Sequence, residues 1–154
     1  MLHYINTSNA KHFSIAEMHM QEEFAHDIQL RHATGVTKES QLWDPMIESS
    51  SSWFCRMMES CDELERIVLI YLVVESCADS VYQKTAGVFE NDDACGHFNT
   101  HLNLDESHSQ LGTSLLEGLS SQHYGELAKI QHKGWQVLEQ LFARFATLVK
   151  GEGA

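Results

Sequence analysis

Hydrophobic and polar residues recur along this chain with the spacing of α-helices. Apolar positions return every three or four residues over most of the length, and few stretches alternate strictly as a half-buried strand would. The glycines and the single proline mostly separate these periodic segments. The pattern therefore predicts an all-α protein, a compact bundle of about five helices. Because 154 residues suffice for one hydrophobic core, we expect a single domain over residues 1–154.

The ends of the helices follow from local signals in the sequence. Asp44 followed by Pro45 is typical of an N-cap and a first-turn proline. The stretch 90–93 is polar and is expected to be a loop, and Gly125 and Gly134 weaken the last helix. The five helices are expected over about residues 9–32, 45–60, 62–85, 95–119 and 122–149.

One carboxylate interrupts the apolar stripe of the third predicted helix. Glu75 lies on the same face as Val68, Tyr71 and Ala78, at spacings of three and four residues. Burying an ionised carboxylate in a dry core destabilises the fold by roughly several kcal/mol unless the carboxylate is paired with a cation or bound to a metal. No basic residue lies three or four positions away on this helix. Glu75 is therefore a candidate metal ligand, although a partner on another helix would also satisfy it.

The fourth predicted helix carries a second candidate cluster. His101, Asp105 and His108 form an H-x-x-x-D-x-x-H pattern that places all three side chains on one face. Imidazole and carboxylate together suit Fe, Mn or Zn. His97 extends the same face by one turn, as a candidate outer partner. The alternative interpretation is the polar face of a surface helix.

The first predicted helix adds a weaker signal. Glu23 and His26 form E-x-x-H, neighbours across one helical turn. His19 and Glu22 lie close by, so the choice of Glu23 rests on spacing alone, and a solvated helix face would explain the pattern equally well. Three separate helices thus offer carboxylate and imidazole groups, and helical bundles commonly hold metals between facing helices.

Composition and charge narrow the classes of partner. The net charge of −12, with only ten Lys and Arg and no basic run, disfavours nucleic acid and anionic membranes. The N-terminus lacks the features of a signal peptide, and the most apolar run, 67–74, is too short to span a bilayer. We therefore expect a cytoplasmic protein whose cysteines are free thiols.

The candidate ligands resemble those of the haem-oxygenase-like diiron oxidases and oxygenases, relatives of an alkene-forming fatty-acid decarboxylase and of a chlamydial protein linked to folate synthesis. That family has a glutamate and a histidine on one helix, a glutamate on a later helix and a closing H-x-x-x-D-x-x-H. The segment 98–108 looks like the closing motif. The positions that match this order are Glu23, His26, Glu75, His101, Asp105 and His108.

The resemblance implies a haem-oxygenase-like bundle holding two iron ions, or manganese, or a mixed manganese–iron pair. Such a centre activates dioxygen to oxidise a small organic substrate, such as a fatty acid, an amino acid or an aromatic precursor. Glu75 would be the catalytic ligand that changes its coordination. Family members have more chain before the first ligand, so this shorter bundle is expected to form a homodimer.

The sequence also offers residues for supporting roles and for alternative functions. Tyr71 and Tyr82 would lie near the oxidant, although both fit ordinary core positions. Basic residues that could bind a substrate carboxylate are Arg31, Arg66 and Lys84. The alternatives are a metal-free, thiaminase-like or cofactor-synthase-like enzyme, the former using Cys77, and a non-catalytic helical interaction protein.

Overall fold

The computed structural model describes residues 10–37, 39, 43–88 and 95–151, and these residues form helices without a β-strand among them. The elements are α2 (Ala10–Glu22), α3 (His26–Thr34), α4 (Pro45–Ser60), α5 (Glu63–Leu69), the π-helical turn η2 (Ile70–Glu75), α6 (Ser76–Thr85), the 3-10 turn η3 (Ala86–Val88), α7 (Cys95–Leu115) and α8 (Ser121–Val149). The prediction of an all-α bundle is confirmed.

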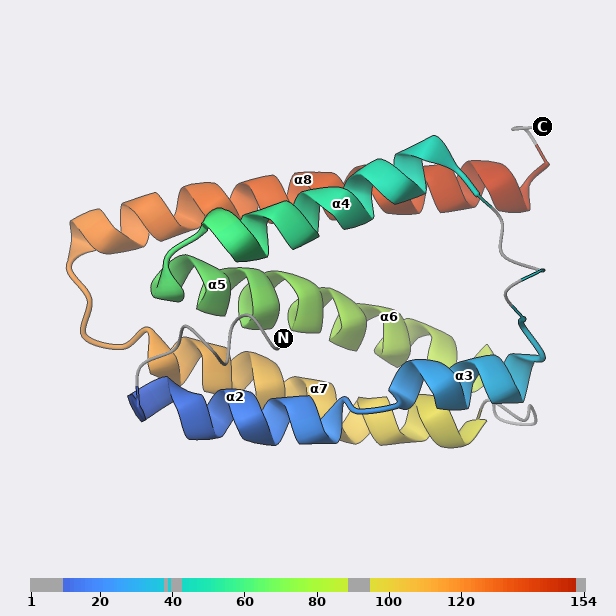
Figure 1. Ribbon diagram of the computed structural model, residues 1–154, viewed down its shortest axis with the longest axis horizontal. Coiled ribbons are helices and arrows are strands. Elements are labelled where there is room, and N and C mark those ends of the chain that lie inside the picture. The colour runs from blue at the N-terminus through green and yellow to red at the C-terminus, as the bar shows by residue number, and fades with distance from the viewer. Residues whose placement is uncertain (1–9, 38, 40–42, 89–94, 152–154) are drawn as a thin grey trace.

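The continuous helix formed by α5, η2 and α6 is the centre of the bundle. It lies between a layer of α4 and α8 on one side and a layer of α2, α3 and α7 on the other (Figure 1). Over residues 67–74 this helix is apolar, and its side chains there are buried except at Leu72 and Val74, as expected for a helix segment packed between two layers. Ile67, Val68, Leu69, Tyr71 and Val73 are each at most 1% exposed. The core therefore surrounds the helix that carries Glu75.

Side-chain caps set the starts of α4 and α5. The Asp44 carboxylate accepts hydrogen bonds from the backbone N–H groups of Met46 and Ile47, which confirms the predicted N-cap before Pro45. The same carboxylate binds Arg144 of α8 at 2.8 Å and thereby ties α4 to its neighbour. Asp62 and Glu65 form a reciprocal capping box at the start of α5.

The single helix expected over 9–32 is wrong. The helix is interrupted between α2 and α3, where Ala25 has the left-handed backbone angle φ = 70°. A non-glycine residue adopts this conformation rarely, because its Cβ crowds the following carbonyl group. Because the helix is interrupted here, Glu23 and His26 are not on one continuous helix.

One further boundary differs from expectation, whereas the last helix, Ser121–Val149, agrees with the prediction. The fourth helix ends at Leu115 rather than near residue 119. The last helix is continuous through Gly125 and Gly134. A Cβ at Gly134 would lie 2.8 Å from a Val73 methyl group, so the glycine permits close packing of α8 on the central helix.

The predicted loop at 90–93 lies outside the described residues. No helix in the described part of the chain is long and apolar enough to cross a membrane.

Candidate metal centre

Four side chains from three parts of the bundle meet in one cluster. His19 comes from α2, Glu23 follows the end of α2, Glu75 ends the π-helical turn, and His108 comes from α7. One ligand atom from each residue lies within 4.8 Å of those of the other three. His19, Glu75 and His108 are buried and Glu23 is half-buried. We call these four residues the His/Glu cluster.

Glu75 is the central group of the His/Glu cluster. Its Oε1 lies 3.1 Å from Nε2 of His19, and its Oε2 lies 3.2 Å from Nδ1 of His108. The other ring nitrogen of His108, Nε2, lies 2.9 Å from Oε2 of Glu22. Both nitrogens of His108 thus face carboxylates, an arrangement that is satisfied when the ring is a doubly protonated imidazolium.

The electrostatics of the pair follow from these contacts. Burial opposes ionisation of Glu75, but the hydrogen bonds and charges of His108 and His19 outweigh it and lower its pKa from 4.5 to about 2. Burial likewise opposes protonation of His108, but Glu75 and Glu22 outweigh it and raise its pKa from 6.5 to about 9. Without a metal, the cluster near neutral pH therefore holds a carboxylate–imidazolium–carboxylate chain.

The π-helical turn brings Glu75 to the cluster. A π turn closes hydrogen bonds between residues five apart and shifts the following side chains around the helix axis. Side chains support this turn: the Leu72 carbonyl accepts from the Trp135 indole at 3.2 Å and from the Gln131 amide at 3.4 Å. The Ser76 hydroxyl donates to the Tyr71 carbonyl at 3.0 Å. Insertions of this kind recur at functional sites.

Buried polar atoms of the cluster are left without hydrogen bonds. Nδ1 of His19 and Oε1 of Glu23 have no hydrogen-bond partner among the residues that the structure describes, and Nε2 of His19 has only its 3.1 Å ion-pair contact with Glu75. An unsatisfied buried polar atom costs about 1–3 kcal/mol. Imidazole nitrogen and carboxylate oxygen are also the donor types that Fe, Mn and Zn accept. The donor set and its unsatisfied atoms therefore fit a transition-metal ion.

A second chain of polar contacts leads away from the cluster. His26 Nδ1 lies 3.2 Å from Oε2 of Glu23, and the His26 and His97 rings meet edge to face with centroids 6.2 Å apart. His97 Nε2 in turn lies 3.1 Å from the Tyr82 hydroxyl. The His26 and His97 side chains thus link Glu23 to Tyr82.

Three of the six predicted ligands lie in the His/Glu cluster. Glu23, Glu75 and His108 belong to the cluster, whereas His26 contacts Glu23 from outside the group of four. His101 and Asp105 lie within α7 between His97 and His108, and their side chains are outside the described part of the structure.

Two residues of the centre were not chosen from the sequence. His19 lies four positions before Glu23, and this i, i+4 spacing is the signal that could have identified it. Glu22 points toward His108, so the adjacent glutamates 22 and 23 both serve the centre.

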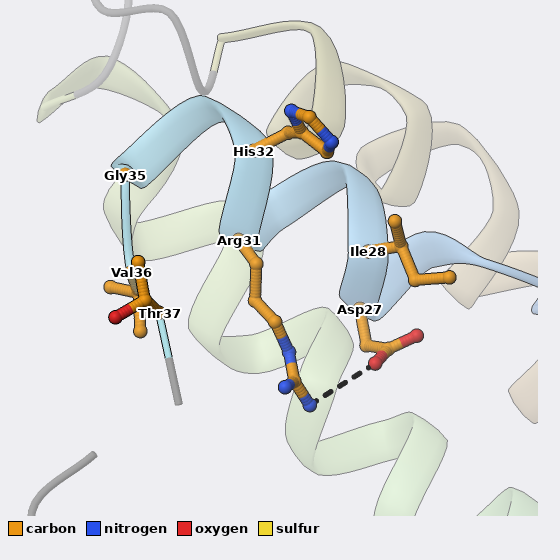
Figure 2. A pocket seen from close by; sticks show the side chains of 7 residues that line it. All are labelled: Asp27, Ile28, Arg31, His32, Gly35, Val36 and Thr37. Atoms are coloured by element: carbon orange, nitrogen blue, oxygen red, sulfur yellow. Dashed lines mark ion pairs between the residues drawn. The ribbon is translucent and has the colours of Figure 1, made fainter. Parts of the chain in front are cut away.

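The basic residues considered for binding a substrate carboxylate have other contacts. Arg31 pairs with Asp27 at 3.2 Å and lines an outer hollow of about 420 Å³ formed by α3 and the residues after it (Figure 2). Arg66 is buried and donates from Nε to the Met58 carbonyl. Lys84 is exposed on α6. None of the three is in the His/Glu cluster.

Comparison with known proteins gives one relative. No family model and no solved structure matches the chain. The chain is 37% identical over 142 residues to the uncharacterized protein RP592 of Rickettsia prowazekii (strain Madrid E), an alignment that covers 92% of this chain and 68% of the relative. Because the identity extends over most of both chains, this chain belongs to the same protein family as the rickettsial protein.

Proposed function

We propose that this protein is a haem-oxygenase-like, non-haem diiron oxidase or oxygenase that uses dioxygen to oxidise a small organic molecule. The observation that carries the proposal is the meeting of His19, Glu23, Glu75 and His108 from separate helices, with two buried donor atoms unsatisfied. The order of Glu23, Glu75 and His108 along the chain also agrees with the resemblance noted above.

The four clustered side chains would hold one ion. The second ion would use His101 and Asp105 of α7, with His26 and Glu22 as additional ligands on the side of α2 and α3. Iron is the proposed metal, and manganese or a mixed pair would accept the same nitrogen and oxygen donors. Bound Fe(II) ions would supply the electrons that reduce dioxygen.

The residues of the chain have definable tasks in this proposal. His108 must release a proton from a ring nitrogen before that nitrogen can bind a metal. Glu75, which contacts His19 through one oxygen and His108 through the other, can bind through one oxygen or both. Tyr71 is fully buried with its ring 5.1 Å from that of His19, where it excludes water from the cluster.

The thiaminase-like alternative is less well supported. Cys77 is buried, and this burial raises the pKa of its thiol above the usual 9.0, whereas a nucleophilic cysteine needs a lowered pKa.

For the non-catalytic alternative, elemental analysis of the purified protein would find no stoichiometric transition metal.

Anaerobic titration with Fe(II) tests the proposal. We expect two equivalents to bind to the native chain, one equivalent to be lost in Asp105→Ala, and binding at the His/Glu cluster to be lost in His19→Ala or Glu75→Ala. His132→Ala removes an exposed histidine of α8 and is the matched control. Native binding no stronger than that of Glu75→Ala would contradict the proposal.

A further inference from the structure

An apolar groove of about 360 Å³ lies beside the His/Glu cluster, between α6, α7 and α8 with Leu30 of α3 at its rim. Val74 of η2 lines one side together with Cys77 and Val81 of α6, and Leu138 and Leu141 line its α8 side. A volume near the lower end of the roughly 300–1,000 Å³ found for ligand pockets suits a small molecule. We call this feature the α6–α8 groove.

The α6–α8 groove shares two helix faces with the His/Glu cluster. Ala78 and Tyr82 line it and lie three and seven residues after Glu75, which is the spacing of one helical face. His97 also lines it and belongs to α7, eleven residues before His108. Because His26 and Glu23 continue the chain of contacts from His97, the groove and the cluster are joined by side chains.

The polarity of the groove is concentrated at one point. Among its described lining residues, the hydrogen-bonding groups are the Tyr82 hydroxyl and the His97 imidazole, 3.1 Å apart, with the Cys77 thiol as a weak third. The Phe98 ring packs edge to face on Tyr82 at 5.4 Å and holds it in place. A ligand with one polar group would place that group here.

The charge of the groove selects against ions. None of the described lining residues is Lys, Arg, Asp or Glu, so a carboxylate or ammonium group would be desolvated without a partner. The net charge of −12 further disfavours anions. A neutral molecule pays neither cost.

We propose that the α6–α8 groove binds a small neutral molecule with an apolar body and one hydroxyl group, which hydrogen-bonds to Tyr82 and His97. The binding rests on the groove itself. Its use as the substrate pocket of the metal centre rests on the proposed function, and would make the substrate an alcohol or a phenol rather than a fatty acid or an amino acid.

Calorimetric titration of the metal-free protein at pH 7.5 tests the proposal with three probes of equal chain length. We expect 1-heptanol to bind saturably at one site, and heptanoate and 1-fluoroheptane to bind at least about tenfold more weakly, since a tenfold change corresponds to 1.4 kcal/mol, the order of one hydrogen bond. Because no metal is present, failure of the diiron proposal leaves this result unaffected.

Two variants assign the binding to the groove. Ala78→Phe should fill it and abolish 1-heptanol binding, whereas Ala146→Phe on the exposed side of α8 should not. Tyr82→Phe keeps the apolar walls and should erase the preference for 1-heptanol over 1-fluoroheptane, a readout that stands even if Ala78→Phe fails to fold. Absence of saturable binding, tighter binding of heptanoate, or an unchanged preference in Tyr82→Phe would overturn the proposal.

Discussion

At the scale of single residues, His108 is the group that contacts two carboxylates of the centre. Its two ring nitrogens contact Glu75 and Glu22, and these contacts raise its pKa to about 9 while the pKa of Glu75 falls to about 2. Both shifts favour the charged forms of the two side chains. A metal ion bound at His108, as we propose, would compete with the proton for the same nitrogen.

These shifts predict how the stability of the metal-free protein depends on pH. The raised pKa of His108 stabilises the fold fully below its ordinary pKa of 6.5, and this contribution is lost as pH rises from 6.5 through about 9. The lowered pKa of Glu75 stabilises the fold above 4.5, and this contribution is lost as pH falls toward 2.

Urea unfolding of metal-free protein across this range measures the effect. We expect the free energy of unfolding to fall between pH 6.5 and 9 in the native chain, and to fall much less in His108→Gln. His132→Gln, at an exposed position, should behave like the native chain. Equal alkaline losses in the native chain and His108→Gln would show that the ring is not held as an imidazolium.

At the scale of helices, the centre depends on two local irregularities and one close approach. The π-helical turn directs Glu75 toward the cluster, and the left-handed Ala25 lies in the short segment between the end of α2 at Glu22 and the start of α3 at His26. The close approach is between α7 and η2, where Gly112 faces Tyr71. A Cβ at Gly112 would lie 2.2 Å from the Cβ of Tyr71, so the spacing between these helices requires glycine.

Two glycines of α7 make a matched pair for testing this spacing. Gly112→Ala should destabilise the protein by about 1–3 kcal/mol, the usual cost of overpacking a core, and should weaken Fe(II) binding by displacing α7 from Glu75. Gly96→Ala, where an added Cβ meets no atom within 4 Å, should be neutral or stabilise by about 0.4–1 kcal/mol. Denaturant unfolding of both variants gives the comparison, and equal stabilities would contradict the packing argument.

At the scale of the whole molecule, the segment from the end of α2 through α3 leaves apolar side chains exposed. Described residues of α3 include none that is buried, and the apolar side chains of Phe24 and Ile28 are 77% and 54% exposed. Exposed apolar side chains in proximity often mark a protein interface. We propose that a second copy of the chain covers this surface, in agreement with the homodimer expected from the sequence.

Sedimentation of the purified protein tests the dimer. The native chain should sediment as a dimer, and the double variant Phe24→Ser/Ile28→Ser should sediment as a monomer because the apolar contact is lost. Val149→Ser changes a residue that is 87% exposed at the end of α8 and should remain dimeric. A native chain that is monomeric at micromolar concentration would refute this interface.

Much of the fold could be predicted because its signals are local. The helical periodicity, the Asp44–Pro45 start and the length of the central helix depend on residues close in sequence, and the structure agrees with them. Glu75 was recognised because a carboxylate on an apolar stripe conflicts with its surroundings within a single helix. Such conflicts can be read before any tertiary contact is known.

The composition of the centre was decided by tertiary structure. Helical spacing favoured Glu23 with His26, and these two remain in contact across the break at Ala25, but His26 is outside the group of four. Packing of α2 against α7 places His19 and Glu22 beside Glu75 and His108. The π turn is likewise supported by distant side chains, because the Leu72 carbonyl accepts from Gln131 and Trp135 of α8. The sequence alone determined which residue types were available for a centre and on which helices they lie. Only the packing of those helices decided which of them meet, because that depends on contacts between residues up to 86 positions apart.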